Sequence, residues 1–159
     1  MIIRPARAED AEALTAILND VIDNTTITFT SKRKTVEDVQ SDIAAKGAAF
    51  LVVEIDGVAA GYASYFPFRN GPGYARTKEH SIALAQHARG KGAGRALMQV
   101  LEEVARADGV HSLWAGISAE NMAGRYFHAT LGFTEIATLP EVGFKFDRWI
   151  DLVLMQKML

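Results

Sequence analysis

Residues 86–95 combine glycine with positive charge in a way that suits binding of a phosphate group. The cations and small residues of this segment, which we call the glycine turn, are Arg89, Gly90, Lys91, Gly92, Ala93, Gly94 and Arg95. Glycines let the backbone approach a ligand closely and turn several N–H groups into one concavity. The apolar run 81–85 and the amphipathic segment 96–107 predict a strand before the turn and a helix after it. The positive end of that helix would then point at the same anion.

The spacing within the glycine turn separates several kinds of phosphate ligand. A nucleotide-binding P-loop has a hydroxyl residue after its lysine, but Gly92 follows Lys91. The spacing Arg89-x-x-Gly92-x-Gly94 also fails the dinucleotide pattern Gly-x-Gly-x-x-Gly. It resembles instead the Arg/Gln-x-x-Gly-x-Gly/Ala signature of the GCN5-related N-acetyltransferases (GNAT), whose loop holds the pyrophosphate of acetyl-CoA. Taken alone, the turn is equally well interpreted as a glycine-rich cap of a helix.

Composition excludes several classes of protein. The chain of 159 residues has 49% hydrophobic and 23% charged residues, so we expect one globular domain over residues 1–159. A net charge of -2 gives no sign of a nucleic-acid partner or of attraction to a membrane surface. The absence of cysteine excludes thiolate zinc sites and a cysteine nucleophile, and the four scattered histidines predict no metal site. With no apolar run of membrane-spanning length and no readable signal peptide, we expect a cytoplasmic protein.

The hydrophobic pattern predicts eleven elements in the order β-α-α-β-β-β-α-β-α-β-β. Strands are expected at 2–4, 50–55, 58–66, 76–85, 112–117, 133–138 and 149–157. Helices are expected at 9–22, 35–46, 96–107 and 121–130. This order predicts an α+β sandwich, a mixed sheet with helices on both faces. The GNAT enzymes have the same order throughout, and the resemblance implies a mostly antiparallel sheet of about seven strands with a splayed central pair.

A second segment, 120–133, resembles the other GNAT signature, Asn-x-x-Ala/Ser-x-x-x-Tyr-x-x-x-Gly-Phe. Asn121 matches, Gly124 is small where Ala or Ser is preferred, and His128 stands where most of the superfamily has Tyr. Asn121 and His128 are two helical turns apart and share a helix face. The resemblance implies that Asn121 bonds the cofactor arm and that His128 lies near its sulfur. It also implies backbone contacts to pantetheine from Ile82, Ala83 and Leu84. From residue type alone, Asn121 could be a helix cap and His128 an ordinary half-buried histidine.

Three further stretches, 24–29, 79–81 and 142–151, resemble the phosphinothricin and methionine sulfoximine acetyltransferases. A histidine at position 128 is also usual in that subfamily. Those enzymes acetylate the α-amino group of small amino-acid analogues and act as homodimers. The resemblance therefore implies an amine acceptor of this type and a homodimer.

Glu79 matches the residue that would serve as the catalytic base. An amine is mostly protonated at neutral pH, and a carboxylate can hold the ammonium and take its proton directly or through water. The second catalytic residue that the resemblance implies is His128, which could protonate or orient the leaving thiolate. The competing interpretation of Glu79 is a solvated charge at the end of a strand.

Substrate recognition calls for a cation, because an amino-acid carboxylate pairs with Arg or Lys. The candidates are Arg69, Arg76 and Lys145, with Phe29, Tyr74 and Trp149 as apolar or aromatic walls. The sequence departs from the subfamily here: Ala75 stands where an Arg is usual, and Arg76 comes one step later. One step in a strand moves a side chain to the other face. Lys78 also replaces a usual apolar residue, so the natural substrate is left open.

Two other functions are compatible with the same motifs. A GNAT enzyme could act on another amine, such as a polyamine, an aminoglycoside or a peptide N-terminus. The Arg and Lys residues of segment 69–78 argue against a cationic substrate. Alternatively, the chain could be a CoA-sensing module without chemistry, which the presence of Glu79 and His128 disfavours.

Overall fold

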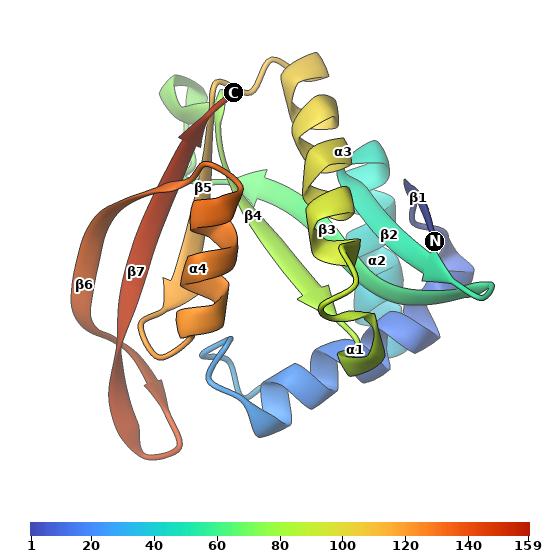
Figure 1. The fold of residues 1–159 in the computed structure, drawn as a ribbon, viewed down its shortest axis with the longest axis horizontal. Helices are drawn as coiled ribbons and strands as arrows, with labels where there is room; N and C mark the ends of the chain where they lie inside the picture. Colours follow the sequence, from blue (N-terminus) through green and yellow to red (C-terminus); the bar gives the residue numbers. More distant parts are fainter.

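The computed structural model describes all 159 residues, and its elements follow the predicted order (Figure 1). The strands are β1 (Ile2–Pro5), β2 (Phe50–Ile55), β3 (Val58–Pro67), β4 (Thr77–Leu84), β5 (Ser112–Ser118), β6 (Thr134–Lys145) and β7 (Arg148–Met158). The helices are α1 (Ala11–Asn24), α2 (Val36–Lys46), α3 (Ala93–Ala107) and α4 (Met122–Thr130). None of the helices has the length and apolar character needed to span a membrane.

The strands form one mixed sheet of seven strands in the order β1-β2-β3-β4-β5-β7-β6. Neighbouring strands are antiparallel except for β4 and β5, which are parallel. The predicted fold class is therefore confirmed. Helices α1 and α2 pack on one face of the sheet and α3 and α4 on the other (Figure 1).

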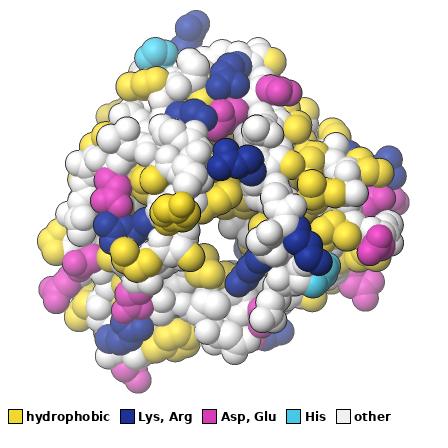
Figure 2. Space-filling view, in the orientation of Figure 1, with side chains coloured by type: hydrophobic (Ala, Val, Ile, Leu, Met, Phe, Trp, Pro, Cys, Tyr) yellow, Lys and Arg dark blue, Asp and Glu magenta, His cyan; other side chains and the backbone are white.

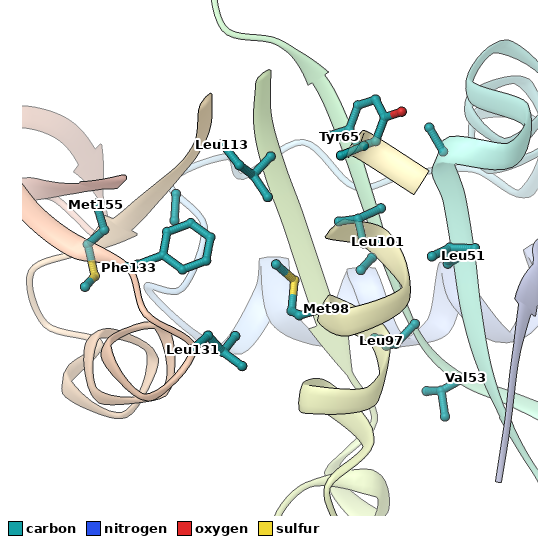
Figure 3. Packing of buried hydrophobic residues seen from close by; sticks show 14 of the residues in the cluster. Leu51, Val53, Tyr65, Leu97, Met98, Leu101, Leu113, Leu131, Phe133 and Met155 are labelled. Atoms are coloured by element: carbon teal, nitrogen blue, oxygen red, sulfur yellow. The ribbon is translucent and has the colours of Figure 1, made fainter. Parts of the chain in front are cut away.

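The larger core lies under α3. Leu97 and Leu101 are completely buried on the inner side of this helix, beside Leu51 and Val53 of β2 (Figure 3). The helix begins at Ala93, three residues before the start that periodicity predicts. Its N-terminal boundary is set by Gly92, which has a left-handed backbone conformation with φ of 80°. The glycine turn therefore ends at Gly92, where α3 begins to pack on the sheet.

The parallel pair β4–β5 separates along its length. Only residues 77–79 of β4 pair with 112–114 of β5, although β4 continues to Leu84 and β5 to Ser118. Beyond Glu79 and Trp114 the two strands part, which confirms the predicted splayed central pair. We call the space between them beyond these two residues the opening.

The hairpin of β6 and β7 is longer than predicted. The prediction ended the first strand at 138 and began the next at 149, whereas β6 reaches Lys145 and β7 starts at Arg148. The turn consists of Phe146 and Asp147, whose φ angles are 53° and 56°. Hairpin turns with two positive φ angles normally carry Asn or Gly. Since phenylalanine gives no such signal, this turn could not be recognised from residue type.

Candidate active site

The edge of β4 along the opening has backbone groups without a strand partner. Residues Ile82 to Leu84 pair with β3 on one side, but β5 no longer pairs with them on the other. Arg89 folds back over this end of the strand, where its Nε and Nη2 donate to the Leu84 carbonyl oxygen at 3.3 and 3.2 Å. An extended ligand with amide groups could bond to this edge as a strand does.

The glycine turn has the backbone geometry of an anion site. Gly90 and Gly92 have φ of 71° and 80°, and nothing lies within 4 Å of where a Cβ atom would stand on either residue. The first N–H groups of α3 follow directly and have no partner within the helix. Arg89, Lys91 and Arg95 are exposed beside them. These features fit the pyrophosphate of a nucleotide cofactor.

Two predicted contact residues of the turn are buried. Ala93 and Gly94 are almost completely covered, so they can offer only backbone N–H groups to a ligand. A Cβ on Gly94 would lie 3.1 Å from Cζ of Phe127 in α4. This third glycine therefore serves close packing of α3 against α4. Arg95 links the same two helices, with its Nη2 donating to Thr130 Oγ1 at 3.3 Å.

The face that carries α3 and α4 is hollowed at its centre. Figure 2 shows this hollow with Lys and Arg side chains at its rim. It lies where Figure 1 places the gap between α4 and the residues that lead into α3. The strand edge, the glycine turn and α4 are thus accessible from one side.

Asn121 is the N-cap of α4. Its Oδ1 accepts a hydrogen bond from the Gly124 backbone N–H at 2.9 Å. The capping role is therefore present, and it fixes the orientation of the amide. The side-chain NH₂ group donates to no protein atom, so it is available for a ligand in the opening.

His128 is buried, with 5% of its surface exposed, and both of its ring nitrogens have partners. Nδ1 lies 2.7 Å from the Gly124 carbonyl oxygen, and Nε2 lies 3.0 Å from Nε2 of His80. Both nitrogens of His128 are therefore already hydrogen-bonded within the protein. His80 was missed by sequence reasoning. The available signal was its position next to Glu79, on the opposite face of the strand.

Glu79 lies where β4 and β5 begin to part, opposite Trp114 in the register. Its side chain leans towards β5: Oε1 is 2.8 Å from where a Cβ atom would stand on Gly116. The carboxylate is half-buried and accepts no hydrogen bond from the protein. Burial raises the pKa of Glu79 above its usual value. A partly desolvated carboxylate without a partner is well suited to hold an ammonium and take its proton.

An aromatic pair forms a wall beside Glu79. The rings of Phe68 and Trp114 stack with their centroids 5.1 Å apart and an angle of 24° between their planes. The guanidinium carbon of Arg69 lies 5.8 Å from the centre of the Phe68 ring. Trp114 and Gly116 were not recognised as site residues from sequence, because only the pairing with β4 brings them to Glu79.

The predicted substrate residues have different surroundings. Phe29 packs on Gly143 of β6, where an added Cβ would be 2.4 Å from its ring. Tyr74 and Arg76 are exposed, in and after the 3₁₀ helix 72–74. Lys145 is 4% exposed, and its Nζ donates to the carbonyl oxygens of Thr25 and Thr28 at 2.7 and 2.9 Å. Two of the three N–H donors of this ammonium thus hold the α1–α2 loop on β6.

Comparison with known proteins agrees with this geometry. Residues 14–133 match the model of the Acetyltransferase (GNAT) family. The L-methionine sulfoximine/L-methionine sulfone acetyltransferase of Salmonella typhimurium is 38% identical over 98% of this chain and 93% of its own. A crystal structure of a ribosomal-protein-alanine N-acetyltransferase from Brucella melitensis superposes with a TM-score of 0.95, with 42% identity and all of both chains covered. An acetyltransferase from Salmonella typhimurium, solved with its cofactor acetyl-CoA, has a TM-score of 0.95 and 37% identity, with 100% of this chain and 94% of that one covered.

Proposed function

Because the chain belongs to the GNAT acetyltransferase family and is an acetyl-CoA-dependent N-acyltransferase, we propose that it acetylates the α-amino group of a small amino-acid-like substrate. Phosphinothricin and methionine sulfoximine represent the expected type. The observation that carries the proposal is the half-buried, unpartnered carboxylate of Glu79 at the start of the opening. The methionine sulfoximine acetyltransferase similar to this chain supports the choice of substrate class.

The cofactor site follows from the open strand edge and the glycine turn. Acetyl-CoA supplies an acetyl group that is already activated as a thioester. The residues proposed to hold it are Ile82, Ala83, Leu84, Arg89, Gly90, Lys91, Gly92, Ala93, Gly94, Arg95 and Asn121. The β4 backbone would bond the pantetheine amides, and the turn would bind the pyrophosphate.

Glu79 is proposed to act as the base. Its carboxylate would hold the substrate ammonium and remove one proton, directly or through a water molecule, which makes the nitrogen a nucleophile. The amine would then attack the thioester carbonyl carbon directly in a ternary complex, without an acetylated protein. The amide C–N bond would form as the C–S bond breaks, and CoA would leave as its thiolate. Alignment of two bound reactants contributes much of the rate in such a reaction.

The surroundings of Glu79 suggest how the rest of an amino acid would bind. If Glu79 holds the α-amine of an amino acid, the side chain of that amino acid would lie towards the stacked rings of Trp114 and Phe68. This wall suits an apolar or thioether-like side chain. Arg69 and Arg76 remain as cations for the substrate carboxylate, since Lys145 already has partners. A polyamine would find positive charge here rather than the acidic pocket that it needs.

The first prediction concerns the choice of acceptor. We expect release of free CoA thiol from acetyl-CoA with methionine sulfoximine, methionine sulfone and phosphinothricin, and slower release with a polyamine or an aminoglycoside. A short peptide with N-terminal alanine should be tested beside these amines, because the similar Brucella melitensis structure is named a ribosomal-protein-alanine N-acetyltransferase. Faster thiol release with the peptide or the polyamine would still show acetyltransferase activity, but it would contradict the proposed class of substrate.

We further propose that the protein is a homodimer associating through the β6–β7 hairpin. The hairpin has large apolar residues that are each more than half exposed, namely Ile136, Val142, Phe144, Phe146 and Trp149. Large apolar residues exposed together on one hairpin are typical of an interface between proteins. A second copy of the same chain is the partner that the subfamily resemblance implies.

The second prediction tests this interface by light scattering after size-exclusion chromatography. The wild-type protein should have the mass of a dimer, and Trp149→Glu should shift it towards a monomer because the charge would be buried at the contact. Val58→Glu is the matched control, since Val58 is equally exposed but lies in the β2–β3 hairpin at another part of the sheet. A monomeric wild type, or a dimer that Trp149→Glu leaves intact, would contradict the proposed interface.

A further inference from the structure

A buried pair of imidazoles joins β4 to α4. Nε2 of His80 and Nε2 of His128 are 3.0 Å apart, and the two rings stack with centroids 5.0 Å apart. Phe133 packs edge-on against both rings. His80 lies on the face of β4 opposite Glu79, so it cannot touch an amine held there.

The hydrogen bonds determine the tautomer of each ring. The Gly124 carbonyl can only accept, so Nδ1 of His128 carries the proton that bonds to it. Nε2 of neutral His128 is then an acceptor, and the proton between the rings belongs to Nε2 of His80. Nδ1 of His80 keeps a lone pair and has no partner. Burial, and secondly His128, lower the pKa of His80 to about 3, and burial lowers that of His128, so both rings are neutral near pH 7.

The pair is one end of a longer chain of hydrogen bonds. His80 donates to His128, which donates to the carbonyl of Gly124. The N–H of the same Gly124 donates to Oδ1 of Asn121, and this bond leaves the Asn121 NH₂ group unbonded. The chain therefore runs from the middle of β4 to the amide proposed to bond the cofactor arm. No other side-chain hydrogen bond connects β4 directly to α4.

We propose that His80 is a positioning residue for the cofactor site, acting through His128 and Gly124 to hold Asn121 at a fixed distance from the β4 edge. The inference rests on the proposed acetyl-CoA site and assigns His128 to orientation rather than to proton transfer. The distance between β4 and α4 is then set by a directional hydrogen bond.

Two substitutions at position 80 test this role. His80→Phe keeps a ring against Phe133 but has no donor, whereas His80→Gln can donate an amide N–H to His128. We expect His80→Phe to weaken CoA binding, measured by calorimetry, by about tenfold, the effect of one lost buried hydrogen bond. In His80→Phe the KM for acetyl-CoA should rise in parallel, and the KM for the amine should stay within about twofold of the wild-type value. His80→Gln should recover most of the lost CoA affinity. The exposed His111, in a His111→Phe variant, is the matched control.

Nitrogen-15 spectra of the histidine rings in the unliganded wild-type protein provide a second measurement. At pH 8 they should show His80 protonated at Nε2 and His128 at Nδ1, and the ring of His80 should not titrate between pH 6 and pH 8. CoA affinity unchanged by His80→Phe, or a His128 protonated at Nε2, would overturn the proposal. The spectra are recorded on the wild-type protein, so they do not depend on the folding of a variant. Neither the spectra nor the calorimetry of CoA binding needs an acceptor amine. A failure of the proposed substrate class would therefore leave both results interpretable.

Discussion

Replacement of Glu79 by glutamine is expected to lower kcat/KM for the acceptor amine by about 10²–10⁴-fold, the usual contribution of a general base. Glutamine has nearly the same shape as glutamate, so it fits over Gly116. It can still hydrogen-bond an ammonium through its oxygen, but it cannot take the proton. The affinity for acetyl-CoA, measured by calorimetry, should stay within about twofold, because Glu79 is not among the residues proposed to hold the cofactor.

The pH dependence gives an independent check on Glu79. Activity requires the ionised carboxylate, so kcat/KM should rise with pH as Glu79 loses its proton. Because burial raises the pKa of Glu79, this rise should lie above the value of 4.5 that is ordinary for glutamate. It should be absent from the residual activity of Glu79→Gln. Glu37→Gln, an exposed position on α2, is the control. Full activity in Glu79→Gln would contradict the proposal that Glu79 is the base and would mean that another group takes the proton.

Truncation of Leu97 to alanine is expected to lower the free energy of unfolding by about 2–5 kcal/mol. Leu97 is completely buried between α3 and the sheet (Figure 3), and the vacated space cannot be filled without moving the helix. Urea unfolding followed by circular dichroism measures the change. Because α3 places the glycine turn, CoA binding should fail at a lower urea concentration in the same variant.

The control for Leu97 is Glu103→Ala, an exposed position on the outer side of the same helix. Its effect on unfolding should be within about 0.5 kcal/mol of zero. A typical core truncation lowers the free energy of unfolding by more than about 1 kcal/mol. A smaller decrease in Leu97→Ala would mean that the core under α3 collapses around the cavity. The glycine turn would then not depend on the packing described here.

Local signals account for the parts of the fold that were predicted correctly. Helix α2, expected over 35–46, begins with a capping box: Thr35 Oγ1 accepts from the Asp38 N–H at 3.0 Å, and the Asp38 carboxylate accepts from the Thr35 N–H at 2.9 Å. Gly90 and Gly92 have the positive φ angles that a phosphate-binding turn needs. Such features depend on a few neighbouring residues, so the sequence displays them directly.

The features that were missed depend on contacts between distant residues. His80 acquires its role only when α4 folds onto β4 and brings His128 to it, 48 residues further along the chain. Trp114 and Gly116 join Glu79 through the register of a parallel strand pair. Lys145 was predicted from its charge to bind a carboxylate, but two loop carbonyls already accept its hydrogen bonds. Residue type states what a side chain can do, and the tertiary contacts decide which partner it meets.

The most direct test of the central claim compares L-methionine sulfoximine with the same compound blocked at its α-nitrogen, using release of CoA thiol from acetyl-CoA as the readout. We expect thiol release with the free amine, in an amount equal to that of an N-acetylated product, and no release with the blocked compound or without an acceptor. Thiol release that does not need the α-amine, or an acetylated protein formed from acetyl-CoA alone, would contradict direct transfer to that nitrogen.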